Sequence, residues 1–188
     1  MINDIILKAK EYAVHKHRSV NQLYSGYLPY EFHLQMAVDV ANRYINGIPD
    51  NKDALISAVW LHDTIEDTRT TYDDLVKEFG INIADIVYAV TNEKGRTRAE
   101  RANDKYYRHI RHTEGAAFVK LCDRIANVQW GIISGGSMLE KYRKEQFNFG
   151  QQLYPKDCDP VLEWMFYDLD TLLNEEHSVL KSWFMPRF

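Results

Sequence analysis

The segment LHDTIEDT, residues 61–68, places charged side chains inside the most apolar stretch of the chain. His62 and Asp63 are adjacent, and Glu66 and Asp67 follow within one helical turn. Unpaired charge is costly to bury in a helix. A divalent cation would compensate for such a cluster, so the segment predicts a metal site.

Two further polar residues interrupt apolar patterns elsewhere. Asp123 lies among aliphatic residues in FVKLCDRIANV, and His33 lies in the amphipathic segment PYEFHLQMAV. Taken singly, such residues are more often a satisfied helix histidine and a salt-bridge partner. Two imidazoles and two carboxylates from three separated helices suit Mn²⁺, Fe²⁺, Co²⁺ or Zn²⁺. We therefore expect one ion, which would activate water and polarise a phosphorus centre, with the ligands His33, His62, Asp63 and Asp123.

Two acidic residues, Glu66 and Asp67, follow His62 and Asp63 at a spacing that suits proton transfer. On a continuous helix over residues 52–66, Glu66 lies four residues after His62, and Asp67 lies four residues after Asp63. These four side chains then share one flank. Glu66 or Asp67 is expected to take up the proton of the attacking water. Asn127 lies four residues after Asp123 and shares its face.

Helical spacing of apolar residues and turn signals between them extend over almost the whole chain, while strand signals are weak. Thr71 predicts an N-cap, and Gly80 predicts the end of the helix that follows. We expect an all-α fold of about eight or nine helices in a single domain over residues 1–188, with a core at about 8–155 and a helical extension at 156–188. The other expected helices span 2–17, 30–45, 52–66, 81–92, 115–130, 138–153 and 160–174, and residues 18–29 are expected to form a loop.

Composition narrows the functional classes. Charged residues make up 27% of the chain and hydrophobic residues 45%, which is ordinary for a globular protein. A net charge of -4 argues against general nucleic-acid binding. Two cysteines are too few for a disulfide framework and fit a reduced, cytoplasmic setting. No run approaches the roughly 20 apolar residues that a membrane span requires.

The order of these motifs resembles a known family. His33, then His62-Asp63, then Asp123 is similar to the HD superfamily of metal-dependent phosphohydrolases. The series HDTIEDT, TYDDLVKEFG, VYAVTNEK and VKLCDRIANV resembles the hydrolase domain of RelA/SpoT-type proteins and the stand-alone Mesh-type small alarmone hydrolases. The resemblance covers roughly residues 8–155.

This resemblance implies an HD-domain fold, one Mn²⁺ ion and removal of the 3′-pyrophosphate from guanosine tetra- or pentaphosphate. It assigns metal ligation to the four residues above, and water activation to Glu66 and Asp67. It places Asn127 near the ribose or the transferred phosphate. The length leaves no room for a second catalytic domain, so a stand-alone hydrolase is expected.

Substrate contacts are expected from basic and aromatic residues. Lys94, Arg96, Arg98 and Arg101 form a basic stretch in an acidic protein and are candidates for the substrate phosphates; the alternative is a solvated charged loop. The family's arginine-containing loop before the first ligand is longer here, and Arg18 is the candidate for stacking on the base. Tyr142 is the candidate to flank the nucleotide, with Gln146 and Phe147 as competitors for that place. Adenine alarmones therefore stay open beside guanine ones.

Two other functions are compatible with these residues. One is an HD phosphohydrolase for another nucleotide, such as a deoxynucleoside triphosphate, a nucleoside monophosphate or NADPH. The other is a non-catalytic nucleotide sensor, which the presence of both Glu66 and Asp67 argues against. The aromatic tail, Ser182–Phe188, is expected to pack on the body or to form a contact in a homo-oligomer.

Overall fold

The computed structural model describes residues 4–48, 50–153 and 159–174. Within these ranges the protein has nine α-helices of eight residues or more and two single-turn helices, so the predicted all-α fold is confirmed. The elements are α1 (Asp4–Ser19), β1 (Leu23–Tyr24), β2 (Leu28–Pro29), α2 (Glu31–Tyr44), the 3-10 turn η1 (Ile45–Gly47), α3 (Lys52–Leu61), α4 (Thr64–Asp67), α5 (Tyr72–Phe79), α6 (Ile81–Val90), α7 (Arg98–Arg101), α8 (Asp104–His112), α9 (Ala116–Ser134), α10 (Met138–Leu153) and α11 (Pro160–Asn174).

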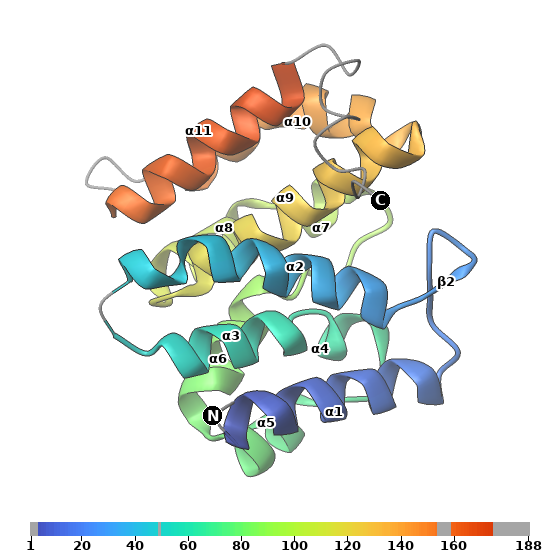
Figure 1. The fold of residues 1–188 in the computed structure, drawn as a ribbon, viewed down its shortest axis with the longest axis vertical. Coiled ribbons are helices and arrows are strands. Elements are labelled where there is room, and N and C mark those ends of the chain that lie inside the picture. The colour runs from blue at the N-terminus through green and yellow to red at the C-terminus, as the bar shows by residue number, and fades with distance from the viewer. Residues whose placement is uncertain (1–3, 49, 154–158, 175–188) are drawn as a thin grey trace, which may run out of the picture.

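The helices stack in successive layers (Figure 1). Helix α1 packs on α3, α3 packs on α2, and α2 packs on α9. Helices α10 and α11 cover the opposite side of α9, and α6 contacts both α3 and α9. Because α2, α3 and α9 are neighbours, the three segments that were expected to supply ligands meet in the interior.

The loop expected at residues 18–29 differs from the structure in two ways. Helix α1 continues to Ser19, and the rest contains a short antiparallel hairpin in which Leu23 pairs with Pro29 and Tyr24 with Leu28. Ser25 and Gly26 at its tip have positive φ angles of 53° and 81°. Such a tight turn leaves too weak a hydrophobic pattern to identify a strand from sequence.

The helix expected over residues 52–66 is interrupted at the ligands. Helix α3 ends at Leu61, α4 begins at Thr64, and Asp63 between them has φ -100° and ψ 0°. Side chains form hydrogen bonds with backbone carbonyl groups at this junction. The Thr64 hydroxyl donates to the Leu61 carbonyl at 2.7 Å, and His62 Nδ1 contacts the Val59 carbonyl at 2.7 Å. Polar side chains that bond nearby backbone groups commonly end or bend helices in this way.

Helix α9 approaches α3 closely where it begins. Gly115 precedes α9 with φ +80°, and a Cβ atom there would lie 2.4 Å from Leu55 Cδ2. Only glycine fits a left-handed position under such a contact without displacement. This close contact lets α9 run beside α3 and carry Asp123 towards His62.

The described helices include none that is long and apolar enough to cross a membrane. Helix α11, from the expected C-terminal extension, packs on α9 and α10. The aromatic tail, Ser182–Phe188, lies outside the described residues, as do Cys158 and His177.

The predicted N-cap at Thr71 supports a stability prediction. Its hydroxyl accepts from the Asp74 amide at 3.2 Å, and the Asp74 carboxylate accepts from the Thr71 amide at 2.9 Å, which forms a capping box. Thr71→Ala removes the hydroxyl and should lower the free energy of unfolding by about 1 kcal/mol. Urea denaturation measures the change. Thr71→Ser keeps the hydroxyl and is expected to stay near the wild-type value; equal losses in both variants would contradict the capping role.

Candidate active site

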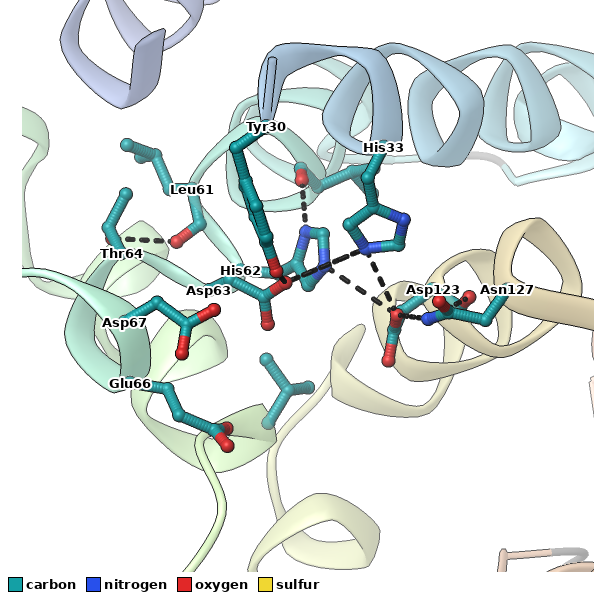
Figure 2. A network of polar contacts seen from close by, with 12 residues as sticks. Tyr30, His33, Leu61, His62, Asp63, Thr64, Glu66, Asp67, Asp123 and Asn127 are labelled. Carbon is teal, nitrogen blue, oxygen red and sulfur yellow. Dashed lines mark hydrogen bonds and ion pairs between the residues drawn. The ribbon is translucent and has the colours of Figure 1, made fainter. Parts of the chain in front are cut away.

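Three helices bring four polar side chains together (Figure 2). His33 comes from α2, His62 and Asp63 from the junction after α3, and Asp123 from α9. The Nε2 atoms of the two histidines lie 3.2 Å apart. Asp63 Oδ2 lies 3.0 Å from His62 Nε2 and 3.5 Å from His33 Nε2, and Asp123 Oδ1 lies 3.7 and 3.3 Å from the same atoms. All four expected ligands therefore converge.

The donor atoms suit a divalent cation. Adjacent ligands at right angles around an ion bound at about 2.1 Å lie about 3 Å apart, as these atoms do. The Val59 carbonyl can only accept, so the contact at His62 Nδ1 places a proton there, and Nε2 is the atom that would ligate an ion. The donor atoms of His33, His62 and Asp123 all lie within 4.8 Å of one another. These residues could hold a metal ion.

Each carboxylate also has a bonding partner outside the ligand group. The Tyr30 hydroxyl donates to Asp63 Oδ2 at 2.6 Å. Lys120 donates to Asp123 Oδ2 at 2.8 Å, and the Asn127 amide donates to Asp123 Oδ1 at 2.5 Å. Such contacts fix the direction in which a ligand oxygen points. Of these partners, Tyr30 was missed by the sequence analysis, since a tyrosine before an amphipathic helix is an ordinary core residue.

The pKa values of the four clustered side chains are set by two opposing effects, burial and the charges of close neighbours. Burial alone would lower the pKa of His62, but Asp63 and Asp123 raise it well above its usual value. Burial alone would raise the pKa of Asp123, but Lys120 and the two histidines hold it well below its usual range. The charged forms of these carboxylates are therefore strongly favoured.

Glu66 and Asp67 lie on α4 beside Asp63, across from Asp123 and Asn127 (Figure 2). The Asn92 amide donates to both oxygens of Glu66, at 3.0 and 2.9 Å. Gln22 donates to Asp67 Oδ2 at 3.2 Å. Burial, and next the charge of Asp63, raise the pKa of Asp67 to about 6. A carboxyl group with such a pKa can exchange a proton near neutral pH.

A cavity of about 600 Å³ opens onto this group. It is lined by three of the expected ligands, His33, Asp63 and Asp123, and by both Glu66 and Asp67. Of the residues expected to contact substrate, those that line the cavity are Arg98, Arg101, Asn127 and Tyr142.

Three other expected contact residues are not brought to the cavity wall among the described residues: Arg18, Lys94 and Arg96. Arg18 is exposed and pairs with Glu31 instead. Lys94 and Arg96 are exposed in the segment before α7. Of the competitors of Tyr142, Phe147 is 79% exposed. The sequence alone could not show that the arginines of α7 line the cavity while the basic residues just before α7 do not.

The hairpin contributes a residue that no sequence signal marks. The Tyr24 ring stacks on His33 with centroids 4.9 Å apart and an interplanar angle of 19°. Its hydroxyl donates to Asn127 Oδ1 at 3.0 Å, and Asn127 in turn bonds Asp123. Trp130 holds the hairpin by donating to the Ser25 hydroxyl at 2.6 Å. Tyr24 therefore supports two of the four expected ligands, His33 and Asp123, from outside the cavity.

His17 on α1 supports a third expected ligand, Asp63, through Tyr30. It is fully buried and stacks on Tyr30 with centroids 4.3 Å apart, while Tyr30 bonds Asp63. Burial lowers the pKa of His17 to about 4, so its ring is neutral at pH 7. Neither ring nitrogen has a hydrogen-bond partner. Packing against the tyrosine is therefore its main interaction.

The fold matches that of a solved structure. A metazoan ortholog of SpoT that hydrolyses ppGpp superposes with a TM-score of 0.67 at 21% identity, over 90% of this chain and 95% of that one. No family model matches the sequence. The architecture is thus the helical fold of this class of hydrolases.

Sequence relatives identify the family. The chain is 31% identical over 124 residues to the guanosine-3′,5′-bis(diphosphate) 3′-pyrophosphohydrolase MESH1 of Mus musculus, which covers 66% of this chain and 68% of the relative. It is 30% identical to MESH1 of Homo sapiens over the same shares. A guanosine-3′,5′-bis(diphosphate) 3′-pyrophosphohydrolase of Aquifex aeolicus is 33% identical over 129 residues but only 17% of its length is covered. The chain belongs to the MESH1 family of pyrophosphohydrolases, which confirms the resemblance seen in the motifs.

The support that Tyr24 gives to the ligands can be measured. Tyr24→Phe removes the bond to Asn127 but keeps the stacked ring, so the affinity for a divalent cation, measured with Mn²⁺ as the probe, should fall several-fold. This is less than the roughly 10- to 100-fold loss that follows removal of a direct partner of a ligand. Isothermal titration of the metal-free protein gives the value. Tyr27→Phe, which alters an exposed residue of the same hairpin, is the control; equal affinities in both variants would show that Tyr24 has no positioning role.

Proposed function

We propose that this protein is a metal-dependent 3′-pyrophosphohydrolase of guanosine tetra- and pentaphosphate or their adenosine analogues. The observation that carries the proposal is the convergence of two imidazoles and two carboxylates on a cavity, in a chain of the MESH1 family. The products would be pyrophosphate and a nucleoside 5′-diphosphate when the substrate is a tetraphosphate. The chain is proposed to act as one catalytic unit.

The metal is proposed to be a single Mn²⁺ ion held by His33, His62, Asp63 and Asp123. When bound, such an ion supplies Lewis-acid activation of water and of the phosphoryl oxygen. Other divalent transition metals suit the same donor set. Tyr30, Lys120 and Asn127 hold the carboxylates in place through the bonds described above.

Proton transfer is proposed to fall to the acidic pair. Asp67 has the raised pKa of a group that accepts a proton from water near neutral pH, and it lies within the cavity wall. Glu66 is fixed by Asn92, which holds its carboxylate in one orientation. We propose that Asp67 accepts the proton while Glu66 positions the attacking water.

Substrate contacts are proposed for Arg98, Arg101, Asn127 and Tyr142, which line the cavity. Arginines stabilise the charge that develops on transferred phosphoryl groups. Base preference is proposed to depend on the segment before His33, where this chain has the hairpin. A cytoplasmic setting is proposed because Cys122 is a buried free thiol.

The decisive measurement is hydrolysis of guanosine and adenosine tetraphosphates with Mn²⁺, with products separated by ion-exchange chromatography. We expect pyrophosphate and a nucleoside 5′-diphosphate, and loss of turnover when the metal is chelated. Asp67→Asn should lower kcat by about 10²- to 10⁴-fold, the usual range for an acid–base group. Asp73→Asn, on the exposed side of α5, is the charge-matched control. Orthophosphate or triphosphate from a wider nucleotide panel would instead favour another HD phosphohydrolase.

A pH dependence follows from Asp67. Its raised pKa of about 6 means that the deprotonated, proton-accepting form prevails above pH 6 and is lost as pH falls through that value. We expect kcat/KM to fall about tenfold for each pH unit below the pKa. Metal content measured at each pH separates this effect from loss of the ion. A flat profile down to pH 5 with metal retained would argue against Asp67 as the acceptor.

A further inference from the structure

A second cluster of charged side chains lines the same cavity and is distinct from the metal ligands. It consists of Arg98 on α7, Arg124 on α9 and Glu145 on α10, and is called the arginine–glutamate cluster below. Arg98 donates from Nε to Glu145 Oε1 at 2.7 Å and from Nη2 to Oε2 at 3.0 Å. Arg124 Nη1 donates to the same Oε2 at 3.0 Å. One carboxylate thus bonds two guanidinium groups.

Arg124 has more bonding capacity than the cluster uses. The residue is 5% exposed, yet its Nε and Nη2 atoms are buried without a hydrogen-bond partner. Its guanidinium lies over the rings of Tyr142 and Phe149, at 4.2 and 4.7 Å from their centroids. Leaving charged N–H groups unpaired in a buried site is unfavourable. A ligand with more acceptor oxygens than one carboxylate would satisfy them.

The geometry around Glu145 is that of an anion site. Bidentate pairing with arginine is common to carboxylates and phosphates. Glu145 is half-buried and its carboxylate sits where the two guanidinium groups meet. Although burial raises the pKa of Glu145, the hydrogen bonds from Arg98 and Arg124 lower it below its usual value, so the group is charged at pH 7.

We propose that Glu145 holds the place of a substrate phosphate group. Arg98 and Arg124 form a subsite for the 5′-diphosphate of the nucleotide, and Glu145 leaves this position when the diphosphate enters. The exchange replaces one carboxylate by a group with more charge and more acceptors, which can also reach the unpaired atoms of Arg124. Glu145 therefore weakens binding of every anion at the subsite and selects for those charged enough to displace it. The assignment to a nucleotide rests on the proposed function; the anion site itself does not.

The test compares ligands that differ only in the diphosphate. Isothermal titration gives the affinities of guanosine and guanosine 5′-diphosphate, and of the adenosine pair, for the Mn²⁺-loaded protein. Glu145→Gln removes the competing charge but keeps the shape of the side chain. We expect the ratio of diphosphate to nucleoside affinity to rise by about tenfold, since each charge-assisted hydrogen bond contributes on the order of a factor of ten. Arg98→Gln should lower the ratio.

Glu140→Gln is the matched control. Glu140 lies on the same helix α10, is exposed and pairs with Arg143, and its change alters the net charge by the same amount. Its affinity ratio is expected to equal that of the wild type. Glu145→Asp retains the charge but shortens the reach, so its ratio should lie between those of the wild type and Glu145→Gln, and it provides a second reading if the amide variant does not fold.

An unchanged or reduced ratio in Glu145→Gln would overturn the proposal, because Glu145 would then hold the arginines in place for the ligand rather than compete with it. No gain of either diphosphate over its nucleoside in any variant would overturn it too. The binding measurement tests the subsite, and the turnover measurement tests the proposed function, so either proposal can fail without the other. A raised ratio without tetraphosphate hydrolysis would refute the proposed function alone, and hydrolysis with an unchanged ratio would refute only the subsite.

Discussion

Two imidazoles and two carboxylates meet in an interior that is made mostly of aliphatic and aromatic side chains, and this constrains how α2, α3 and α9 can pack. A buried charge is tolerated only when it is paired or bonded. Here Tyr30, Lys120 and Asn127 each bond one of the carboxylates. The core therefore has to place these partners as accurately as the ligands themselves.

The supporting residues come from parts of the chain that are distant in sequence. His17 from α1 stacks on Tyr30, and Tyr24 from the hairpin stacks on His33 and bonds Asn127. Aromatic faces suit this task because they bury a large area and keep a fixed orientation. Helix α1 and the hairpin thus pack around the expected ligands, which come from α2, the end of α3 and α9.

Much of this could be predicted from sequence where the pattern is local. The helix boundaries at 138–153 and 160–174 match α10 and α11, because turn residues flank both segments. The four expected ligands could be named because polar residues in apolar helices are conspicuous, and the structure brings their side chains together. The break at His62–Asp63 was missed, since the side-chain bonds to the Val59 and Leu61 carbonyls that accompany it leave no trace in hydrophobic periodicity.

Contacts between residues that are far apart in the sequence could not be predicted, for a different reason. Tyr24 and Asn127 are 103 residues apart, and Arg98 and Glu145 are 47 apart. No spacing rule connects such positions, because their contact is set by how whole helices pack. The basic stretch before and within α7 looked uniform in sequence, although only Arg98 and Arg101 of its four basic residues reach the cavity.

Asp123 and Arg124 are consecutive residues of α9, an unbroken helix of 19 residues. A continuous helix keeps its side chains at fixed separations, since successive residues advance by about 1.5 Å along one axis. The Asp123 carboxylate and the buried Arg124 guanidinium are therefore carried on one continuous backbone with no hinge between them. If one ligand contacts both groups, the separation of its own charged groups has to match the spacing that this single helix sets.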